Sequence, residues 1–335
     1  MNHSVVALVG SESLLGKEVR EVAGQYVPAA RLQLVGADAA SVFTEDEGEA
    51  VVITGMDEVS LGEADVAALA GTAESSRRAF AIVSKLADAP AVIDLTRSLE
   101  DNPRARLRAP MAEPPGYAAE ASAIHVIAHP AAIALAVFLN RLHASHPVRQ
   151  AVVQILEPAS EQGQRGINEL QQQTVSLLSF KPLHKEIYDE QVSFNLVARY
   201  GAEAPRPLQE IEATIERHLA TLLSRSSGAP MPSLRLVQAP VFHGYSFSVW
   251  VRFDENAGPE AIAESLASAL VEIRAADEEP PTNVGVTGQT GLTVGVIERD
   301  RNDRQACWFW LVADNLRLVA ENAVLVARAL LERGQ

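Results

Sequence analysis

Continuous apolar runs, separated by polar turns that carry glycine, dominate the first third of the chain. Such runs are typical of strands that are buried on both faces of a parallel sheet. The strands we expect are residues 5–9, 31–36, 51–54, 66–70, 91–95 and 124–127. The helices we expect from apolar residues at helical spacing are residues 14–26, 75–86 and 133–142. This alternation predicts a parallel, doubly wound α/β sheet, in which ligands bind at the carboxyl ends of the strands.

The pattern changes after residue 149. The expected strands are residues 150–156, 234–241, 246–253, 294–297 and 306–312, and the expected helices are residues 167–178, 207–223, 259–273 and 313–332. Residues 101–117, rich in proline and arginine, and residues 160–166 are predicted to be loops. Strands with helices on one face predict an α+β layer, and long sheet faces of this kind often form dimers. The predicted organisation is a Rossmann-type dinucleotide-binding domain (1–132 plus 308–335) with an inserted α+β domain (133–307).

The turn after the first strand is the candidate cofactor site. It consists of Gly10, Ser11, Glu12, Ser13, Leu14, Leu15 and Gly16. A dinucleotide fingerprint has three glycines; Gly10 and Gly16 supply two, and Ser13 replaces the one that lets backbone approach the pyrophosphate. Glu12 places a carboxylate where a phosphate would lie, and this disfavours a bound anion. The alternative interpretation is an ordinary strand–turn–helix that packs tightly at Gly16.

A second turn, residues 128–133, joins an apolar strand to a helix. The first-turn amides of such a helix attract negative charge, so they would activate a thiol or stabilise an oxyanion. The position where that thiol is needed holds Ala132. The chain's one cysteine, Cys307, lies in a predicted strand and is expected in the core.

The composition limits the class of protein. A length of 335 residues predicts two domains, and a hydrophobic content of 47% is sufficient for packed cores. The net charge of −15 argues against binding to nucleic acid or to an anionic membrane surface. No apolar run approaches the ~18 residues of a transmembrane helix, and no basic leader precedes the first strand, so we expect a cytoplasmic protein. One cysteine excludes internal disulfides and cysteine-rich metal sites.

Six segments, in order along nearly the whole chain, resemble the motifs of one enzyme family. They are residues 10–16, residues 127–133, residues 160–170, Phe194-Asn195, residues 238–246, and residues 310–317 with Asn322-Ala323-Val324. By this resemblance the chain is identified as a divergent member of the aspartate-β-semialdehyde dehydrogenase family, within the acylating semialdehyde dehydrogenase superfamily. Each motif alone is modest, and it is their order that makes the resemblance specific.

The resemblance implies a fold and a reaction. The fold is a Rossmann-type domain with an inserted dimerisation domain, which implies a homodimer. The reaction is the NADP-dependent interconversion of aspartyl phosphate and aspartate semialdehyde in amino-acid biosynthesis. In it a cysteine thiolate attacks the aldehyde, a histidine takes the proton, and phosphate releases the thioester. Residues 10–16, with Gly71 and Asn322, correspond to the family's NADP site.

The family's reactive positions hold different residues in this sequence. The resemblance places Ala132 at the nucleophile position and Tyr245 at the histidine position. It places Gln238 where a substrate-binding arginine is found in the family, and Glu157 where a glutamine is found. We therefore expect semialdehyde dehydrogenase activity to be absent or very weak.

Other substitutions in the family's pattern exchange cations for acids. A second arginine of the family falls near Glu100, and a lysine falls near Glu212. A pocket changed in this way would repel the substrate carboxylate and the phosphate, the two anions that the family reaction needs. Glu12 and Ser13 likewise argue against the NADP binding that the resemblance implies, because Glu12 adds a negative charge and Ser13 replaces a glycine of the fingerprint.

Other residues could replace the lost ones. His129 and His243 could approach one another if the family fold holds, and with Tyr245 and Glu157 they could form a new acid–base or metal site. The alternative is that both are structural histidines, and we expect no bound metal. Three functions remain open. They are an enzyme with little or no activity, a small-ligand binder, and a pseudoenzyme subunit that forms a homodimer or pairs with an active paralogue.

Overall fold

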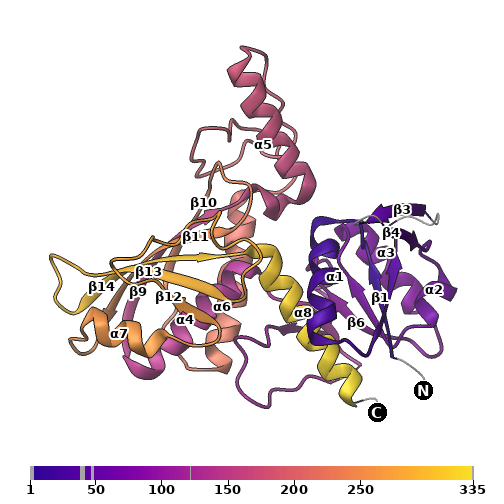
Figure 1. Ribbon diagram of the computed structural model, residues 1–335, viewed down its shortest axis with the longest axis horizontal. Coiled ribbons are helices and arrows are strands. Elements are labelled where there is room, and N and C mark those ends of the chain that lie inside the picture. Colours follow the sequence, from indigo (N-terminus) through magenta and orange to yellow (C-terminus); the bar gives the residue numbers. More distant parts are fainter. Residues whose placement is uncertain (1–3, 38–41, 47–48, 121, 334–335) are drawn as a thin grey trace. The chain divides into compact units, whose positions relative to one another are not determined.

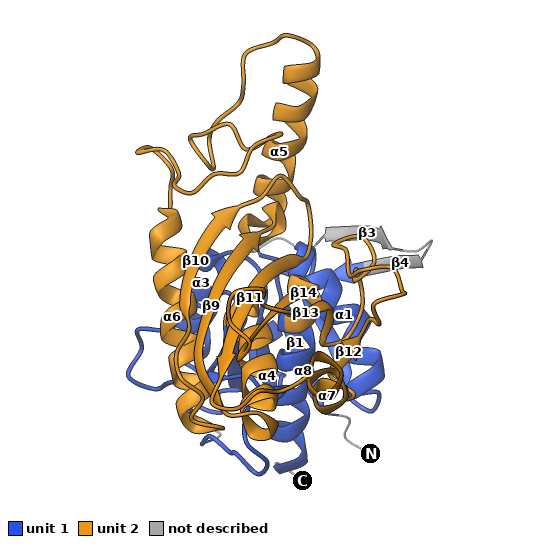
Figure 2. Cartoon of the chain, turned by 90° about the vertical axis from the view of Figure 1, so that its left-hand side faces the viewer, with its two compact units in different colours: residues 1–128, 319–335 blue, residues 129–318 orange. Residues whose placement is uncertain are grey.

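The computed structural model describes residues 4–37, 42–46, 49–120 and 122–333. The chain divides into two compact units, residues 1–128 with 319–335 and residues 129–318 (Figure 2). The sequence pattern predicts these boundaries at 132/133 and 307/308. The second boundary lies later because strand β14 (Ala306–Ala313) pairs with β11 (Tyr245–Phe253) inside the second unit.

Unit 1 is built on a six-stranded sheet in the order β2-β1-β5-β6-β8-β7 (Figure 1). Its strands are β1 (Val5–Val9), β2 (Arg31–Val35), β5 (Val66–Leu69), β6 (Ala91–Asp94), β7 (Ala105–Arg108) and β8 (Ile124–Ile127). Its helices are α1 (Leu14–Tyr26), α2 (Glu58–Gly62), α3 (Ala73–Val83) and the part of α8 (Asn315–Arg333) that follows position 318. Every pairing in the sheet is parallel, which confirms the predicted Rossmann-like sheet. The strand order reverses between β1 and β5, the place where sheets of this kind bind ligands.

One prediction for unit 1 is wrong, and another is confirmed only in part. The predicted loop 101–117 contains β7, which pairs with β8 at the edge of the sheet. Arg104 and Arg106 donate to backbone carbonyls, so the basic cluster of this segment is committed to the fold. The strand expected at 51–54 is present as β4 (Glu49–Ile53), but it pairs with β3 (Val42–Asp46) in an antiparallel hairpin, and only Thr54, just after it, bridges β2 in parallel. An apolar run indicates a strand, but it does not identify the strand's partner.

Unit 2 has a mixed sheet in the order β10-β9-β11-β14-β13-β12. Its other strands are β9 (Val148–Glu157), β10 (Ser233–Gln238), β12 (Val271–Ile273) and β13 (Leu292–Arg299). Its helices are α4 (Pro130–Ser145), α5 (Gly163–Leu178), α6 (Leu208–Arg225), α7 (Pro259–Leu266) and the short 3₁₀ helix η1 (Ala159–Gln162). The three central pairings are antiparallel and the two outer ones are parallel. This arrangement confirms the predicted α+β layer.

Predicted element ends in unit 2 also need correction. The helix expected at 259–273 ends at Leu266, and the chain continues into strand β12. The loop expected at 160–166 is largely helical, because α5 already begins at Gly163. Gly166 allows the helix to pack closely, since a Cβ there would lie 2.4 Å from the carbonyl oxygen of Ala159. Glycine signals a loop in a sequence, and here it serves close packing instead.

The two faces of the unit 2 sheet differ. One face is packed with fully buried residues such as Phe247 and Val249, and it meets α4, where the rings of Phe138 and Phe309 lie 5.2 Å apart. The other face carries Trp250 and Trp308, paired across β11 and β14, with their indole N–H groups both donating to Asp300.

Among the described residues, no helix combines the length and the apolar character needed to cross a membrane.

Candidate functional site

Helix α4 begins at the turn that the sequence singled out, and His129 is its N-cap. The imidazole Nδ1 accepts the backbone N–H of Ala131 at 3.3 Å, while Pro130 occupies the first helical position, where no N–H is needed. The backbone N–H of His129 donates to Nδ1 of His218, on α6, at 2.9 Å. Ala132 follows in the first turn, fully buried, and contributes only a methyl group.

An acid–imidazole pair lies at the same helix start. Nε2 of His129 is 3.3 Å from Oε1 of Glu161, and the two side chains are 0% and 7% exposed. The ring of Tyr245 lies edge-on to the imidazole, with the centroids 5.9 Å apart. Because Nδ1 accepts from Ala131, the ring proton lies on Nε2 and faces the carboxylate of Glu161, which holds the ring in place. These groups can therefore accept and return a proton.

Glu157, at the end of β9, is the centre of a buried network. Its carboxyl oxygens lie 3.4 Å from the hydroxyl of Tyr245, 3.3 Å from that of Tyr200, and 3.2 Å from Nε2 of Gln162. Burial, and then the charge of Glu161, raise the pKa of Glu157 from 4.5 to about 8. The carboxyl group is therefore mostly neutral at pH 7, and it can donate a proton to a hydrogen bond.

Gln238, at the end of β10, completes this network. Its Oε1 lies 2.6 Å from the hydroxyl of Tyr200, and its Nε2 donates to the backbone carbonyls of Glu157 and Ala239. The Tyr200 hydroxyl faces two acceptors, and its contact with Gln238, at 2.6 Å, is shorter than its contact with Glu157, at 3.3 Å. Burial also raises the pKa of Tyr200, so its phenol keeps the proton.

The structure brings together some of the expected residues and not others. Tyr245, Glu157 and Gln238 share one network, and His129 adjoins it through Tyr245. His243 precedes the turn at Gly244, and its backbone carbonyl accepts a hydrogen bond from Asn283. The partners that sequence reasoning missed are Glu161, Gln162, Tyr200 and His218. Glu161 and Gln162 lie in the polar segment after β9 that was predicted as a loop, whereas no sequence signal marks Tyr200 or His218.

The two acids expected near the lost cations have other roles. Glu212, on α6, accepts the backbone N–H of Leu236 at 2.6 Å and pairs with Arg235 at 3.3 Å, so it closes part of the open edge of β10. The backbone N–H of Glu100 donates to the carbonyl of Arg97 in the turn after β6. Among the described residues, no group of three or more His, Cys, Asp or Glu side chains is arranged to hold a metal ion.

In unit 1, the turn at residues 10–16 is closely packed at the β1–β5 switch point. Gly10 has a φ of +76°, and a Cβ there would lie 2.3 Å from Cα of Gly71. Ser13 caps α1, because its hydroxyl accepts the N–H of Gly16 at 2.9 Å and donates to the carbonyl of Ala70 at 2.7 Å. The carboxylate of Glu12 accepts the N–H of Ala37, just beyond β2, at 2.9 Å.

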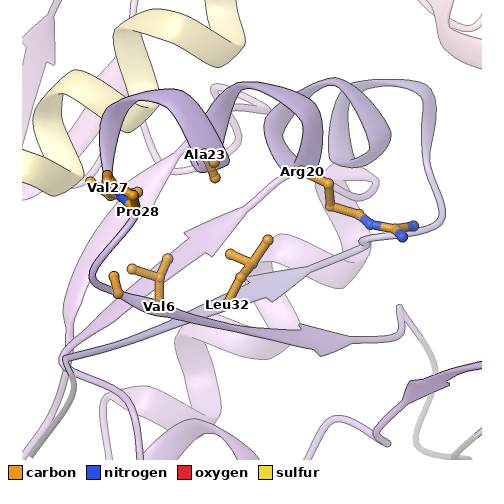
Figure 3. Close-up of a pocket in the computed structure, with 8 residues that line it drawn as sticks. Val6, Arg20, Ala23, Val27, Pro28 and Leu32 are labelled. Carbon is orange, nitrogen blue, oxygen red and sulfur yellow. The ribbon is translucent and has the colours of Figure 1, made fainter.

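Asn322, the remaining expected cofactor residue, is buried in α8 and accepts the backbone N–H of Met111 at 3.1 Å. It therefore fixes the segment after β7. A cavity of about 210 Å³ also lies in unit 1, between α1 and the starts of β1 and β2 (Figure 3). Apart from Arg20 its lining is apolar, with Val6 and Leu32 beneath the helix. Because this cavity lies at the amino ends of the strands, it is separate from the ligand-binding edge of the sheet.

A Rossmann-like sheet followed by an inserted α+β domain defines a class of two-domain dehydrogenases. Residues 139–318 match the family described as semialdehyde dehydrogenase, dimerisation domain. The chain belongs to this family, as its resemblance to aspartate-semialdehyde dehydrogenases predicted.

Individual relatives agree with this assignment. The chain is 29% identical to a USG-1 protein homologue of Pseudomonas aeruginosa, with 98% of this chain and 97% of that protein covered. It is 25% identical, with the same coverage, to an aspartate-semialdehyde dehydrogenase of Rickettsia bellii. The solved structure of a probable aspartate-semialdehyde dehydrogenase from Pseudomonas aeruginosa has a TM-score of 0.80 at 27% identity and covers both chains completely. Aspartate semialdehyde dehydrogenase II from Vibrio cholerae, in complex with ASA, shares the fold with a TM-score of 0.80, 22% identity and 99% coverage of both chains.

Proposed function

We propose that this chain is a non-catalytic member of the aspartate-semialdehyde dehydrogenase lineage, a dimer-forming subunit that does not perform the lineage's thioester chemistry. The observation that carries the proposal is Ala132. The resemblance assigns this position to the nucleophile, and the side chain there is a buried methyl group in the first turn of α4. Loss of an activated nucleophile removes several orders of magnitude of rate.

No second thiol takes over the role. Cys307 is the one cysteine of the chain, it is buried in β14, and burial raises its pKa. A thiol with a raised pKa carries little thiolate at neutral pH, and thiolate is the reactive form. Thioester formation therefore has no candidate nucleophile in this chain.

The polar network supports the same proposal. Tyr245 and Gln238 replace the histidine and the arginine that the resemblance implies, and both side chains are engaged with Glu157 or Tyr200. The network is satisfied by the protein's own groups, because Glu157 is bonded to Gln162 and Tyr200, and Gln238 is bonded to the backbone. Its organisation favours a stable core over an anion-binding pocket.

The dinucleotide turn fits a cofactor only in part. The close approach of Gly10 and Gly71 is the packing that a dinucleotide turn needs, but Ser13 already uses the N–H of Gly16, and Glu12 adds a negative charge. A solved aspartate semialdehyde dehydrogenase from Candida albicans, with NADP, shares the fold at a TM-score of 0.68 and 13% identity. We assign no step to NADP in this chain, and we propose that it binds NADP weakly. Calorimetry with NADP and NAD tests this, and micromolar binding would contradict it.

The decisive experiment is an assay of NADP reduction with aspartate semialdehyde and phosphate. We expect no turnover above background, that is, a rate at least ~10⁴-fold below that of a relative with the reactive residues. Saturable turnover by the unaltered protein would overturn the proposal. The matched variant is A132C/Q238R/Y245H. A clear gain in its rate of NADP reduction would show that only the reactive groups are missing. No gain in that rate would show that the pocket has diverged further.

A second candidate function rests on the pair of His129 and Glu161, which with the neutral Glu157 offers one proton acceptor and one proton donor. Such a combination could bind or process a small polar ligand. Native mass spectrometry of the purified protein tests this alternative, because a bound metabolite that is lost in the H129A variant would support it.

The proposed partner is a second copy of this chain in the cytoplasm, because the matched family is defined by its dimerisation domain. An active paralogue is the alternative partner. Affinity purification distinguishes the two, since recovery of a second semialdehyde dehydrogenase would favour the mixed dimer.

A further inference from the structure

The cavity beneath α1 in unit 1 results from small residues on one face of the helix. The helical residues that line it lie at positions i, i+3, i+4 and i+7, which share one face: Arg20, Ala23, Gly24 and Val27. A helix face that packs on a sheet normally carries large apolar side chains at such positions. Here the two middle positions hold alanine and glycine, so the helix and the strands beneath it leave unfilled space between them.

The floor and one end of this cavity are apolar. Val6 of β1 and Leu32 of β2 are paired across the sheet and form the floor. At one end, the N–H of Ala30 donates to the carbonyl of Val27 at 3.0 Å, and Pro28 lies within this turn. The hydrogen bond and the proline ring fix the end wall, so the cavity is already formed before a ligand binds.

Arg20 gives the cavity its charge. Of the eight described residues that line the cavity, Arg20 alone has a charged side chain, and it lies at the end opposite Val27 and Pro28 (Figure 3). A guanidinium group has five N–H donors in a planar fork, so it can bind a carboxylate and still keep another contact within the protein. A cation at one end of an apolar cavity favours a ligand with an anionic head and an apolar tail.

The size of the cavity limits the length of such a ligand. Its volume of about 210 Å³ exceeds the ~150 Å³ of an apolar cavity that binds benzene, and it is smaller than the ~300 Å³ at which drug-sized pockets begin. Along α1, the distance from Arg20 to Val27 is about 10 Å, because a helix rises ~1.5 Å per residue. An aliphatic chain of medium length fits both the volume and this distance.

Gly24 supports a role for this space in binding. A glycine inside a helix lowers stability relative to alanine. Packing within the chain does not require a glycine here, because a Cβ at position 24 would have no atom of the surrounding structure within 4 Å. Residues that break a local rule of stability are found chiefly at functional sites. The missing side chain keeps the cavity wide beside Ala23.

We propose that this cavity binds a medium-chain aliphatic carboxylate, with the carboxylate group on Arg20 and the chain above Val6 and Leu32. Burial of the chain and the charge-assisted hydrogen bonds to the guanidinium together supply the affinity. The site is formed by unit 1 alone and lies at the amino ends of the strands, whereas the expected cofactor turn lies at their carboxyl ends. It gives the chain a ligand-binding function that does not depend on the thioester chemistry.

Calorimetry with octanoate and methyl NMR spectra of the unaltered protein test the proposal. We expect saturable one-site binding with a dissociation constant below ~1 mM, and shifts of the methyl resonances of Val6, Val27 and Leu32. Val251 and Leu311, in the core of unit 2, are the internal control and should not shift. Binding that does not saturate at millimolar octanoate, or methyl shifts that leave the three cavity residues unaffected, would overturn the proposal. Neither measurement involves aspartate semialdehyde or NADP, so the ligand site and the loss of catalysis can be refuted separately.

A charge variant tests the contact with Arg20. Arg20→Met keeps an aliphatic side chain but removes the guanidinium group, so it should weaken octanoate binding about tenfold or more. The matched control is Arg31→Met, which removes an exposed cation next to Leu32 that does not line the cavity, and it should leave octanoate binding unchanged. Octanol, which has the same chain without the carboxylate, should bind equally to R20M and to the unaltered protein. Equal losses of octanoate affinity in R20M and R31M would assign the effect to general surface charge and refute the Arg20 contact.

Discussion

Glu157 shows how one residue can alter the character of a site. The resemblance places a glutamine here, which is neutral at every pH, whereas a glutamate must either ionise without solvent or hold its proton. The surrounding groups, with Tyr200 and Tyr245 as neutral hydrogen-bond partners and Glu161 as a nearby charge, favour the second outcome. The site thus stores a proton where the family is expected to have an amide.

This proton makes stability depend on pH. The folded state keeps it up to about pH 8, whereas the unfolded chain releases it near 4.5, so the folded state binds more protons between these values. The unfolding free energy should therefore fall as pH rises from 4.5 to 8. For Glu157→Gln we expect this loss, on the order of 2–4 kcal/mol, to disappear.

Urea titrations at pH 5, 6.5 and 8 provide the measurement. The matched control is Glu264→Gln, an exposed acid on α7, which should follow the wild type at every pH. Equal pH slopes for wild type and E157Q would mean that Glu157 is already ionised in the folded protein.

Two of the glycines in or beside helix α1 have opposite roles. Gly10, in the turn before it, lies against the backbone of Gly71, which cannot move aside. Gly24, inside the helix, has no heavy atom within 4 Å of a Cβ built there, and it borders the cavity of Figure 3. The first glycine is required by close packing, and the second only weakens the helix.

The two alanine variants should therefore change stability in opposite directions. We expect Gly10→Ala to lower the unfolding free energy by about 2–3 kcal/mol, because it combines a backbone clash with an unfavourable positive φ. Gly24→Ala should raise it by about 0.5–1 kcal/mol, since alanine is the better helix former. Thermal unfolding of both variants provides the measurement. Destabilisation by G24A would show that the fold is stable only when the cavity beside α1 stays open.

At the level of elements, sequence patterns identified most strands and helices but not their partners. The apolar runs of β1, β5 and β8 are unambiguous because both faces are buried. Strand β7 was missed because two of its four residues are arginines, Arg106 and Arg108, so this edge strand has no continuous apolar run. In the site, Glu157 and Tyr245 were found through the resemblance. Tyr200 and His218 were not, because their roles depend on tertiary contacts from distant elements, which no local pattern encodes.

At the scale of the whole molecule, the chain leaves unit 1 after residue 128 and returns to it at residue 319. The returning part of α8 supplies groups that unit 1 cannot replace. Asn322 accepts the N–H of Met111, and Arg333 donates to the carbonyl of Ala119. Unit 1 is therefore complete only when both ends of the chain are present.

Truncation after Leu318 should uncouple the two units. We expect hydrogen exchange in β1, β5 and β6 to lose most of its protection, while β9, β11 and β14 keep theirs. Asn322→Ala is the milder comparison, because it removes the acceptor for the N–H of Met111 and should cost about 1 kcal/mol or more. Unchanged protection of unit 1 after truncation would show that residues 4–128 fold independently.

The interrupted unit also affects the order of events during synthesis. The 190 residues of unit 2 are translated between the two parts of unit 1, which takes about 10–40 s at typical ribosomal speeds. During that interval the β1–β8 sheet has been made but lacks its closing helix, whereas unit 2 can fold as soon as it emerges. We therefore expect the nascent amino-terminal segment to need chaperones, and slow translation of the middle of the message to prolong its exposure.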